Sequence, residues 1–385
     1  MPFTYVTQPV SGPECFTRSD DAAIRTQAAV LLAVGSQLRG DTERLRSVSP
    51  GFAPQAEVLP EEARSLLALP ALQPVAGRAE TVRLRELLYG RYNLQPRENA
   101  AAQAARRPEI LEDVARRYFE EGAGNTAFDL LEMSLLQWHE LIRVAAASAY
   151  VEHSAERERL LNVLEQGTHS TDILVRDVAA TSLAHANPNH PRLLELQAKQ
   201  TRRGAAGPAD TTMIIHGTWA ADSPWWQPGG DFHTYILQNV RPDLYNKPDR
   251  FGWSGGYSDA ARTLAAQDLI LWVNQRNEQG LDLITHSHGG NVAMQATQIN
   301  PGLMVGELIL LSCPVHIPKY QPNFGMITKR AVSIRVHLDL VILADRGGQK
   351  FTLPQITENV LPVWFDHFAT HKPEIWQKYN VPAML

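Results

Sequence analysis

The sequence predicts an all-α N-terminal half followed by an α/β half built on a mainly parallel sheet. Up to about residue 200 the chain is rich in Ala, Leu, Arg and Glu, and its apolar residues recur at spacings of three and four, as in helices. After that point, short apolar segments typical of strands alternate with helical segments, a pattern that favours a parallel sheet covered on both faces. The Gly/Pro/Ala-containing stretch 201–210 has the composition of a linker. We therefore expect a helical domain over 1–204 and an α/β domain over 205–385.

The composition narrows the class of protein. A chain of 385 residues with 44% hydrophobic and 20% charged residues can form two cores. Its net charge of −5 argues against a general nucleic-acid partner, which would need a basic face. No apolar run approaches the roughly 20 residues of a membrane span, and the N-terminus lacks the features of a signal peptide. With two cysteines and no disulfide framework, we expect a cytoplasmic protein without a transmembrane segment.

The helical half contains an internal repeat. Helices are expected over 20–46, 60–69, 78–92 and 108–121 from the spacing of their apolar residues. The Arg- and Ala-containing segment 142–150 aligns with 175–183, 33 residues later, and its small residues would let helices stack closely. This pattern resembles the second helix of a HEAT-type repeat, which implies a HEAT-like domain. An irregular helical bundle is the alternative.

The second half is expected to form strands and helices in alternation. Strands are predicted over 211–219, 249–256, 281–287, 306–315, 331–343 and 359–367, and helices over 260–275 and 289–298. Ser287 ends the expected strand 281–287, and Gly289 begins the expected helix 289–298. A serine on a sharp strand-to-helix turn is a nucleophile elbow: the turn exposes its Oγ, and the helix N-terminus favours negative charge there. Thr285 stands where the usual G-x-S-x-G pattern has its first glycine.

Four segments in order resemble the α/β-hydrolase superfamily, specifically its bacterial esterase- and lipase-like members. They are "IIHGTW" at 214–219, the turn at Ser287, "HLDLV" at 337–341 and "FDHFATHKPEIW" at 365–376. The resemblance covers about 211–385 and implies an α/β-hydrolase fold after the HEAT-like domain. Asp366, directly before the fourth segment's first histidine, departs from the glycine that is common there.

The resemblance implies a set of site residues. Ser287 would be the nucleophile, His367 the base and Asp339 the acid, with the backbone amides of Thr218 and His288 as the oxyanion hole. Asp345 is the alternative acid and His371 the alternative base. The histidines that flank the serine are expected to pack or line the site rather than act as bases.

These residues predict a serine hydrolase that cleaves a small-molecule carboxylic ester through an acyl-enzyme, with no cofactor and no metal. Amide, thioester and lactone bonds would use the same machinery. Trp219, Trp225, Trp226 and Trp253 are expected either to line an acyl pocket or to pack on the core. The helical domain would cap the active site or bind a protein partner. The alternative function is a helical-repeat interaction module with a vestigial hydrolase domain.

Overall fold

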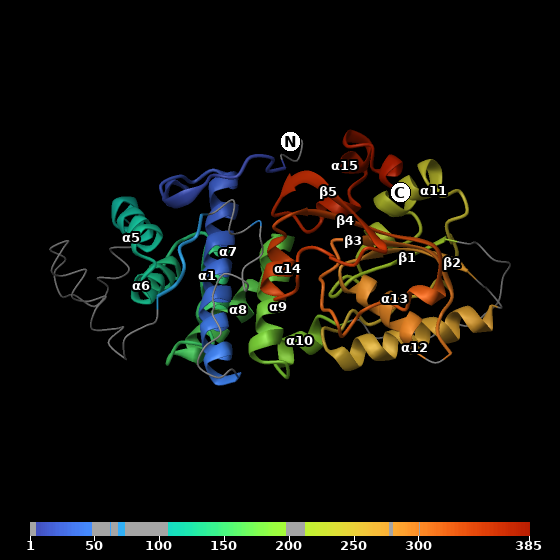
Figure 1. Cartoon of the computed structure of the whole chain (residues 1–385), viewed down its shortest axis with the longest axis horizontal. Coiled ribbons are helices and arrows are strands. Elements are labelled where there is room, and N and C mark those ends of the chain that lie inside the picture. The colour runs from blue at the N-terminus through green and yellow to red at the C-terminus, as the bar shows by residue number, and fades with distance from the viewer. Residues whose placement is uncertain are drawn as a thin grey trace. The chain divides into compact units, whose positions relative to one another are not determined.

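The computed structural model describes residues 5–47, 62, 68–73, 107–197, 212–276, 280–299 and 301–385 (Figure 1). The chain divides into a helical unit, 1–187 with 343–346, and a second unit, 188–342 with 347–385. The division after Asn187 precedes the boundary expected after residue 204, which lies outside the described residues, as do the expected linker 201–210 and helix 78–92. Of the expected helix 60–69, only residues 62, 68 and 69 are described.

The described part of the helical unit contains a short 3₁₀ helix and six α-helices. They are η1 (Gly12–Phe16), α1 (Asp21–Ser47), α5 (Pro108–Glu121), α6 (Gly124–Ser134), α7 (Glu140–Tyr150), α8 (Arg157–Gly167) and α9 (Ile173–Ala186). Helix α5 has the bounds that the spacing of its apolar residues predicts, with a proline in its first turn and Gly122 in the left-handed conformation after its end.

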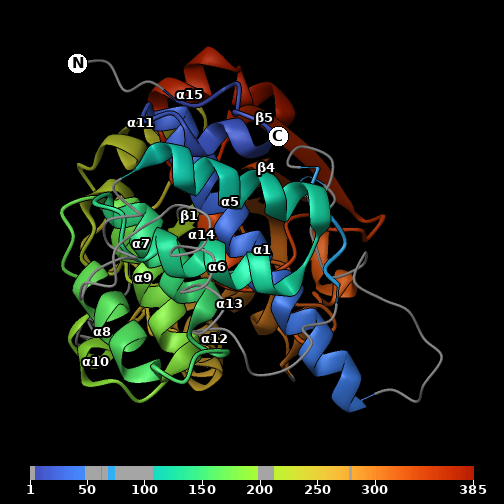
Figure 2. The ribbon, with the colours of Figure 1, turned by 90° about the vertical axis from the view of Figure 1, so that its left-hand side faces the viewer.

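The predicted repeat corresponds to α7 and α9, which pack against each other and against α8 (Figure 2). Small residues allow this close approach: a Cβ added to Gly167 would lie 2.6 Å from a methyl of Val144 and 2.8 Å from Ala179. The hydroxyl of Ser182 donates a 2.7 Å hydrogen bond to that of Ser148 between the two helices. The aligned segments therefore face each other through small side chains.

The second unit is built on a five-stranded parallel sheet in the order β1-β2-β3-β4-β5. The strands are β1 (Thr212–Ile215), β2 (Leu281–His286), β3 (Val305–Leu311), β4 (Ile327–His337) and β5 (Ile356–Trp364). Every residue of β1, β2 and β3 is buried, because helices cover both faces. This arrangement is an α/β fold, the class that the alternation of segments predicts.

Helices lie on both faces of this sheet (Figure 1). The second unit contains α10 (Pro191–Glu195), α11 (Asp231–Asn239), α12 (Asp259–Gln275), α13 (His288–Gln298) and α15 (Pro373–Lys378), the 3₁₀ helices η4 (Pro224–Trp226), η5 (Phe324–Met326), η6 (Ala369–His371) and η7 (Val381–Met384), and the start of α14 (Leu340–Ala344). Helices α12 and α13 pack together on one face and α11 and α15 on the other. No helix in the described ranges is long and apolar enough to cross a membrane.

Two expected strands differ from the structure. Residues 249–256 form no strand; instead Thr212 of β1 makes an isolated parallel bridge with Leu244. The apolar run 331–343 does not continue as one strand either, because β4 ends at His337 and α14 begins at Leu340. The strand prediction was therefore wrong for 249–256 and for 338–343.

The chain turns sharply at the carboxyl ends of four strands. The first residue after each of β2, β3, β4 and β5 has a positive φ: Ser287 (53°), Ser312 (43°), Leu338 (44°) and Phe365 (70°). Such angles are uncommon for residues other than glycine and cost free energy. They bring the residues that follow the strands to one edge of the sheet, where parallel α/β folds place their ligands.

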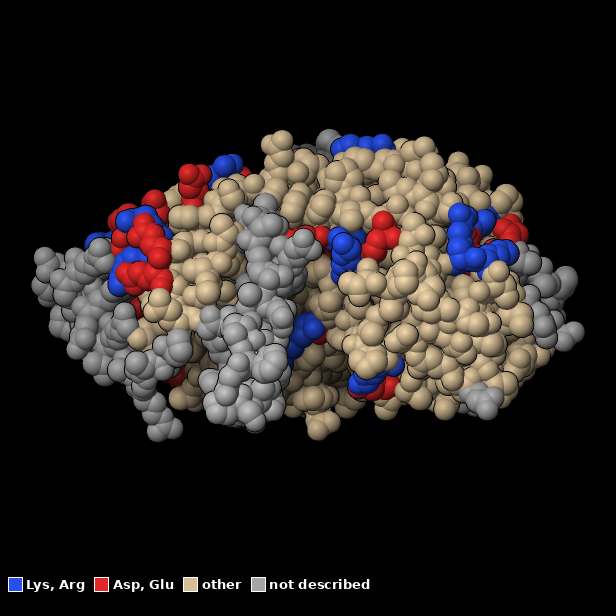
Figure 3. Space-filling view, viewed as in Figure 1, with Lys and Arg blue, Asp and Glu red and all other residues tan. Residues whose placement is uncertain are grey.

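The opposite edge carries charged groups. Asp282 and Glu307 are buried near the amino ends of β2 and β3, and the Glu307 amide donates a 2.8 Å hydrogen bond to the Asp282 carboxylate. Lys329 of β4 lies 2.9 Å from Asp282, and Arg330 and Arg241 pair with Glu307. On the face drawn in Figure 3, acidic and basic side chains likewise lie in small mixed groups rather than in an area of one sign.

Candidate active site

Ser287 occupies a strained turn between β2 and α13. Its φ of 53° and ψ of −136° lie outside the regions that a serine ordinarily adopts. Its amide donates a 2.8 Å hydrogen bond to the Leu311 carbonyl of the neighbouring strand, which helps to hold the turn. The first turn of α13 follows directly, so its partially positive N-terminus adjoins the serine. The local geometry is that of the strand-turn-helix predicted from the sequence.

Glycines allow the end of β1 to contact this turn. A Cβ on Gly289 would lie 2.5 Å from the His216 carbonyl oxygen and 2.6 Å from that of Ile215, so a side chain there would push α13 away from β1. A Cβ on Gly217 would lie 2.6 Å from the Cβ and 3.3 Å from the Oγ of Ser287. The segment that carries Thr218 therefore packs directly against the serine.

His216 holds this segment in place through both ring nitrogens. The Trp253 amide donates to Nε2 over 3.4 Å, so Nδ1 carries the proton and donates a 2.8 Å bond to the Gly217 carbonyl. The indole of Trp253 in turn donates to the His216 carbonyl over 2.9 Å. Burial lowers the pKa of His216 to about 4, so its imidazole is neutral near pH 7. This geometry suits a positioning residue and not a base.

His367 and Asp339 form a buried pair at the ends of β5 and β4. His367 Nδ1 lies 2.7 Å from Asp339 Oδ2, and both side chains are almost fully inaccessible. A carboxylate accepts, so Nδ1 carries the proton and Nε2 presents its lone pair. Asp339 Oδ1 accepts from the amides of Val341 and Ile342 at 3.0 and 3.2 Å, and these two bonds fix the orientation of the carboxylate.

The alternative acid and base make other contacts. Asp345 groups with the helical unit, where its carbonyl oxygen lies 2.9 Å from His185 Nε2. His371 is buried, and its ring stacks on Trp225 with centroids 4.0 Å apart. Neither of its ring nitrogens makes a hydrogen bond of ordinary geometry with the described residues. The structure thus pairs His367, and not His371, with Asp339.

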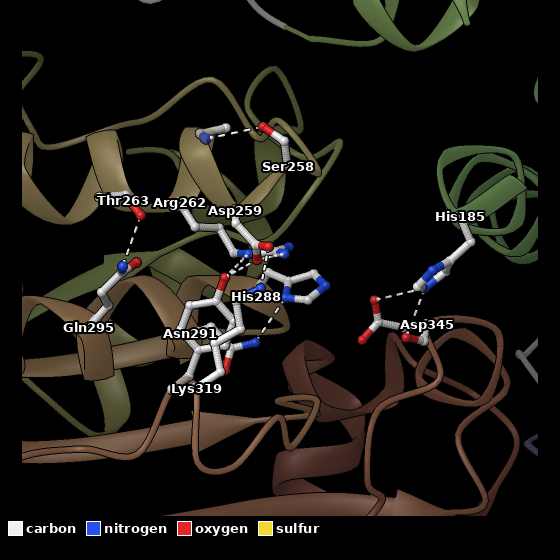
Figure 4. A network of polar contacts seen from close by, with 12 residues as sticks. His185, Ser258, Asp259, Arg262, Thr263, His288, Asn291, Gln295, Lys319 and Asp345 are labelled. Atoms are coloured by element: carbon white, nitrogen blue, oxygen red, sulfur yellow. Dashed lines mark hydrogen bonds and ion pairs between the residues drawn. The ribbon is translucent and has the colours of Figure 1, made fainter. Parts of the chain in front are cut away.

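The side chain of His288 is held by contacts with Asn291 and Tyr257. Its Nδ1 accepts a 2.8 Å hydrogen bond from Asn291 Nδ2 one turn along α13 (Figure 4). Tyr257 packs edge-on against the ring, with centroids 5.6 Å apart. The Asn291 amide is completely buried, so this contact fixes the first turn of the helix from within. The backbone amide of His288 is at the first position of α13, directly after Ser287.

A second polar cluster borders this region at the start of α12 (Figure 4). Asp259 accepts from Arg262 over 2.8 Å and also from Lys319 and Tyr320. These contacts hold the pKa of the Asp259 carboxyl well below its usual range despite the opposing effect of partial burial. Arg262 also donates to the Tyr320 hydroxyl over 2.9 Å, so the four groups form one network joining α12 to the loop after β3.

The tryptophans near the site mainly pack on other residues. Trp226 and Trp253 lie on His216, with ring centroids 4.5 and 5.7 Å away. Trp219 has a φ of 60° and stacks at 6.2 Å on Tyr257, and both of these rings are half-buried. Core packing therefore accounts for Trp226 and Trp253, whereas Trp219 keeps an accessible edge beside Thr218.

One residue of the site had no signal in the sequence beyond its position next to the serine. His286, the last residue of β2, lies with Nε2 3.1 Å from the carbonyl oxygen of His367. The two residues are 81 positions apart, so no local pattern could pair them. Its place in a segment predicted to be a buried strand marks it as a polar group that needs a partner.

Comparison of this chain with protein-family models, with curated proteins and with solved structures finds no match in any of the three.

Proposed function

We propose that the second unit is a serine hydrolase of the α/β-hydrolase type that cleaves carboxylic esters through an acyl-enzyme. The observation that carries the proposal is the buried 2.7 Å hydrogen bond between His367 and Asp339, at the same edge of the sheet as the strained turn of Ser287. A buried imidazole whose Nδ1 is paired with a carboxylate is the group that a serine needs as a base.

The mechanism follows from the roles of these groups. Ser287 Oγ attacks the ester carbonyl carbon while His367 Nε2 takes its proton, and Asp339 stabilises the resulting imidazolium. The negative charge that develops on the carbonyl oxygen is stabilised by the amides of Thr218 and His288, one from the turn after β1 and one from the start of α13. His367 then protonates the leaving alcohol, and water hydrolyses the acyl-enzyme by the reverse sequence.

Two features of the turn support the assignment of the nucleophile. The strained φ of Ser287 is of the kind that concentrates at active sites, where it positions a reacting group at a cost to stability. The contact of Gly217 with the Ser287 side chain puts the Thr218 segment beside the reacting atom, as an oxyanion hole requires.

Hydrolysis of p-nitrophenyl butyrate tests the proposal. The wild-type chain should release p-nitrophenol with saturable kinetics, whereas Ser287→Ala should be reduced to background at an unchanged melting temperature. As a matched control, Ser312→Ala changes a buried serine that also follows a strand with a positive φ, and should retain the activity. Equal rates for the wild type and Ser287→Ala would exclude Ser287 as the nucleophile.

A helical-repeat interaction module is the second candidate function. The observation that favours it is Trp138, in the turn before α7, whose side chain is 77% exposed. Tryptophan is enriched among the residues that carry most of the binding energy at protein interfaces. The stacking of α7, α8 and α9 through small residues supports a HEAT-like arrangement for this unit. Absence of ester hydrolysis and of serine labelling in a folded wild-type chain would favour this function.

A further inference from the structure

His286 lies at the junction between the proposed nucleophile and the proposed base. It is the last residue of β2, directly before Ser287, and its side chain is only 4% exposed. Its Nε2 lies 3.1 Å from the backbone carbonyl oxygen of His367. One imidazole thus joins the turn that carries the serine to the loop that carries the base.

The direction of this hydrogen bond fixes the state of the ring. A carbonyl oxygen can only accept, so Nε2 of His286 carries the proton and Nδ1 does not. Nδ1 is buried and has no hydrogen-bond partner among the described residues. Burial, together with the nearby His371 and His367, holds the pKa of His286 well below its usual value, so the ring stays neutral. A neutral ring cannot replace His367 as a proton acceptor through Nε2, which is already a donor.

Aromatic groups restrict the orientation of the His286 ring. Trp225 packs edge-on against it at 5.4 Å between centroids, and His371 does so at 4.6 Å. Trp225 and His371 also stack on each other at 4.0 Å, so the three rings pack together. The His367 ring lies 4.7 Å away on its own loop.

His367 is therefore held at two points. Asp339 binds its Nδ1 over 2.7 Å, and His286 binds its carbonyl oxygen over 3.1 Å. With the ring anchored by one contact and the backbone by the other, little freedom remains for Nε2. We infer that His286 is a positioning residue, which sets the distance between His367 Nε2 and Ser287 Oγ by tying the backbone of the base to the residue before the nucleophile. This inference rests on the proposed function.

Substitutions that differ in reach test the inference. Gln places a side-chain amide nitrogen near the position of His Nε2, whereas Asn places it near Nδ1, too short to reach the His367 carbonyl. His286→Gln should therefore keep the bond, and His286→Asn and His286→Leu should lose it. His233→Leu is the matched control, since His233 is a buried histidine whose Nε2 also lies 3.1 Å from a backbone carbonyl, that of Tyr245 in the same unit.

The readout is the second-order rate of labelling by a fluorophosphonate, together with kcat and KM for p-nitrophenyl butyrate. His286→Asn and His286→Leu should lower the labelling rate and kcat by about 10- to 100-fold, because displacing a catalytic group by about 1 Å can reduce the rate by up to about 100-fold. KM should stay within about threefold of the wild-type value, because the substrate-binding groups are unchanged. His286→Gln should remain within about threefold of the wild type, and His233→Leu should label at the wild-type rate. If His286→Leu does not fold, the Gln and Asn pair decides. Wild-type rates in His286→Asn, or an equal loss in the Gln and Asn variants, would overturn the inference.

A measurement independent of activity separates this inference from the proposed function. In a wild-type chain that neither labels nor hydrolyses esters, the proposed function fails, but the ¹H–¹⁵N resonance of His367 Nδ1–H still reports on the geometry. It should be observed as a sharp downfield signal in the wild type and His286→Gln, and broaden or disappear in His286→Asn. An unchanged signal in His286→Asn would overturn the positioning role.

Discussion

Nδ1 of His367 donates a 2.7 Å hydrogen bond to Oδ2 of Asp339, and the other oxygen of the carboxylate accepts from two backbone amides. In Asp339→Asn, the amide oxygen must face those two N–H groups, so its NH₂ would point at His367. Nδ1 would then have to accept, and the proton would move to Nε2, where a lone pair is needed. We expect kcat for ester hydrolysis to fall on the order of 10⁴-fold.

Asp345→Asn is the control for this substitution. The Asp345 carboxylate lies 3.9 Å from His185 Nε2, and both residues belong to the helical unit, so kcat should change by less than about threefold. A larger loss in Asp345→Asn than in Asp339→Asn would move the acid of the triad to Asp345.

The strained turn of Ser287 predicts a conflict between stability and activity. Glycine adopts a φ of 53° without the cost that serine or alanine bears there, which is on the order of 1–3 kcal/mol. Ser287→Gly should therefore melt at a higher temperature than Ser287→Ala, although both are inactive. A lower melting temperature for Ser287→Gly, measured by differential scanning calorimetry, would show that the turn is not strained.

The contact between Gly217 and Ser287 predicts a selective loss of activity. In Gly217→Ala the new methyl would lie 2.6 Å from the Ser287 Cβ, so the turn that carries Thr218 must move away from the serine. The rate of ester hydrolysis should drop by at least about 100-fold, as for loss of an oxyanion donor. Gly325→Ala, whose methyl would meet only the Asn323 side-chain oxygen at 3.2 Å, should retain the wild-type rate. Retention of activity in Gly217→Ala would argue against an oxyanion hole in this turn.

Acid should destabilise the second unit. The pKa of His216 is about 4 in the folded chain and about 6.5 when unfolded, so only the unfolded chain binds the proton between these values. The free energy of unfolding should therefore fall as the pH drops from about 6.5 to about 4, by about 1.4 kcal/mol for each pH unit at full effect. Burial lowers the pKa values of His286 and His371 as well, and these residues act in the same direction.

Denaturant melts of the wild type and His216→Asn across pH 4 to 7.5 measure this effect. Asn can still donate to the Gly217 carbonyl from the position of Nδ1 but does not titrate. The pH dependence of the variant's stability should be shallower than that of the wild type. Parallel curves would mean that His216 does not contribute to the acid sensitivity.

Local patterns in the sequence account for much of the fold, and their failures have identifiable causes. The apolar segments at 281–286 and 305–311 are fully buried strands, because a parallel sheet covered on both faces needs continuous apolar runs. Residues 249–256 contain the large apolar side chains of Phe251 and Trp253, yet Trp253 is buried by contacts with His216 from a loop. Burial alone does not distinguish a strand from a loop that packs on the core.

The boundary between β4 and α14 also has no signal in the sequence. Apolar and polar residues alternate over 332–340 without a break at His337, and the strand ends where Leu338 adopts a φ of 44°. This turn presents Asp339 to His367, a partner 28 residues later. The contact of His286 with His367 likewise joins distant residues. Motifs alone predict the types and order of the candidate site residues, but the contacts that orient them depend on tertiary packing.

Reaction with a fluorophosphonate followed by peptide mass spectrometry tests the central claim most directly, because it detects an activated serine without knowledge of the natural substrate. The folded wild-type chain should gain a single adduct on the peptide that contains Ser287, and His367→Gln should react at least about 100-fold more slowly. An unlabelled wild-type chain, or an adduct on any other serine, would contradict the assignment of Ser287 as a nucleophile activated by His367.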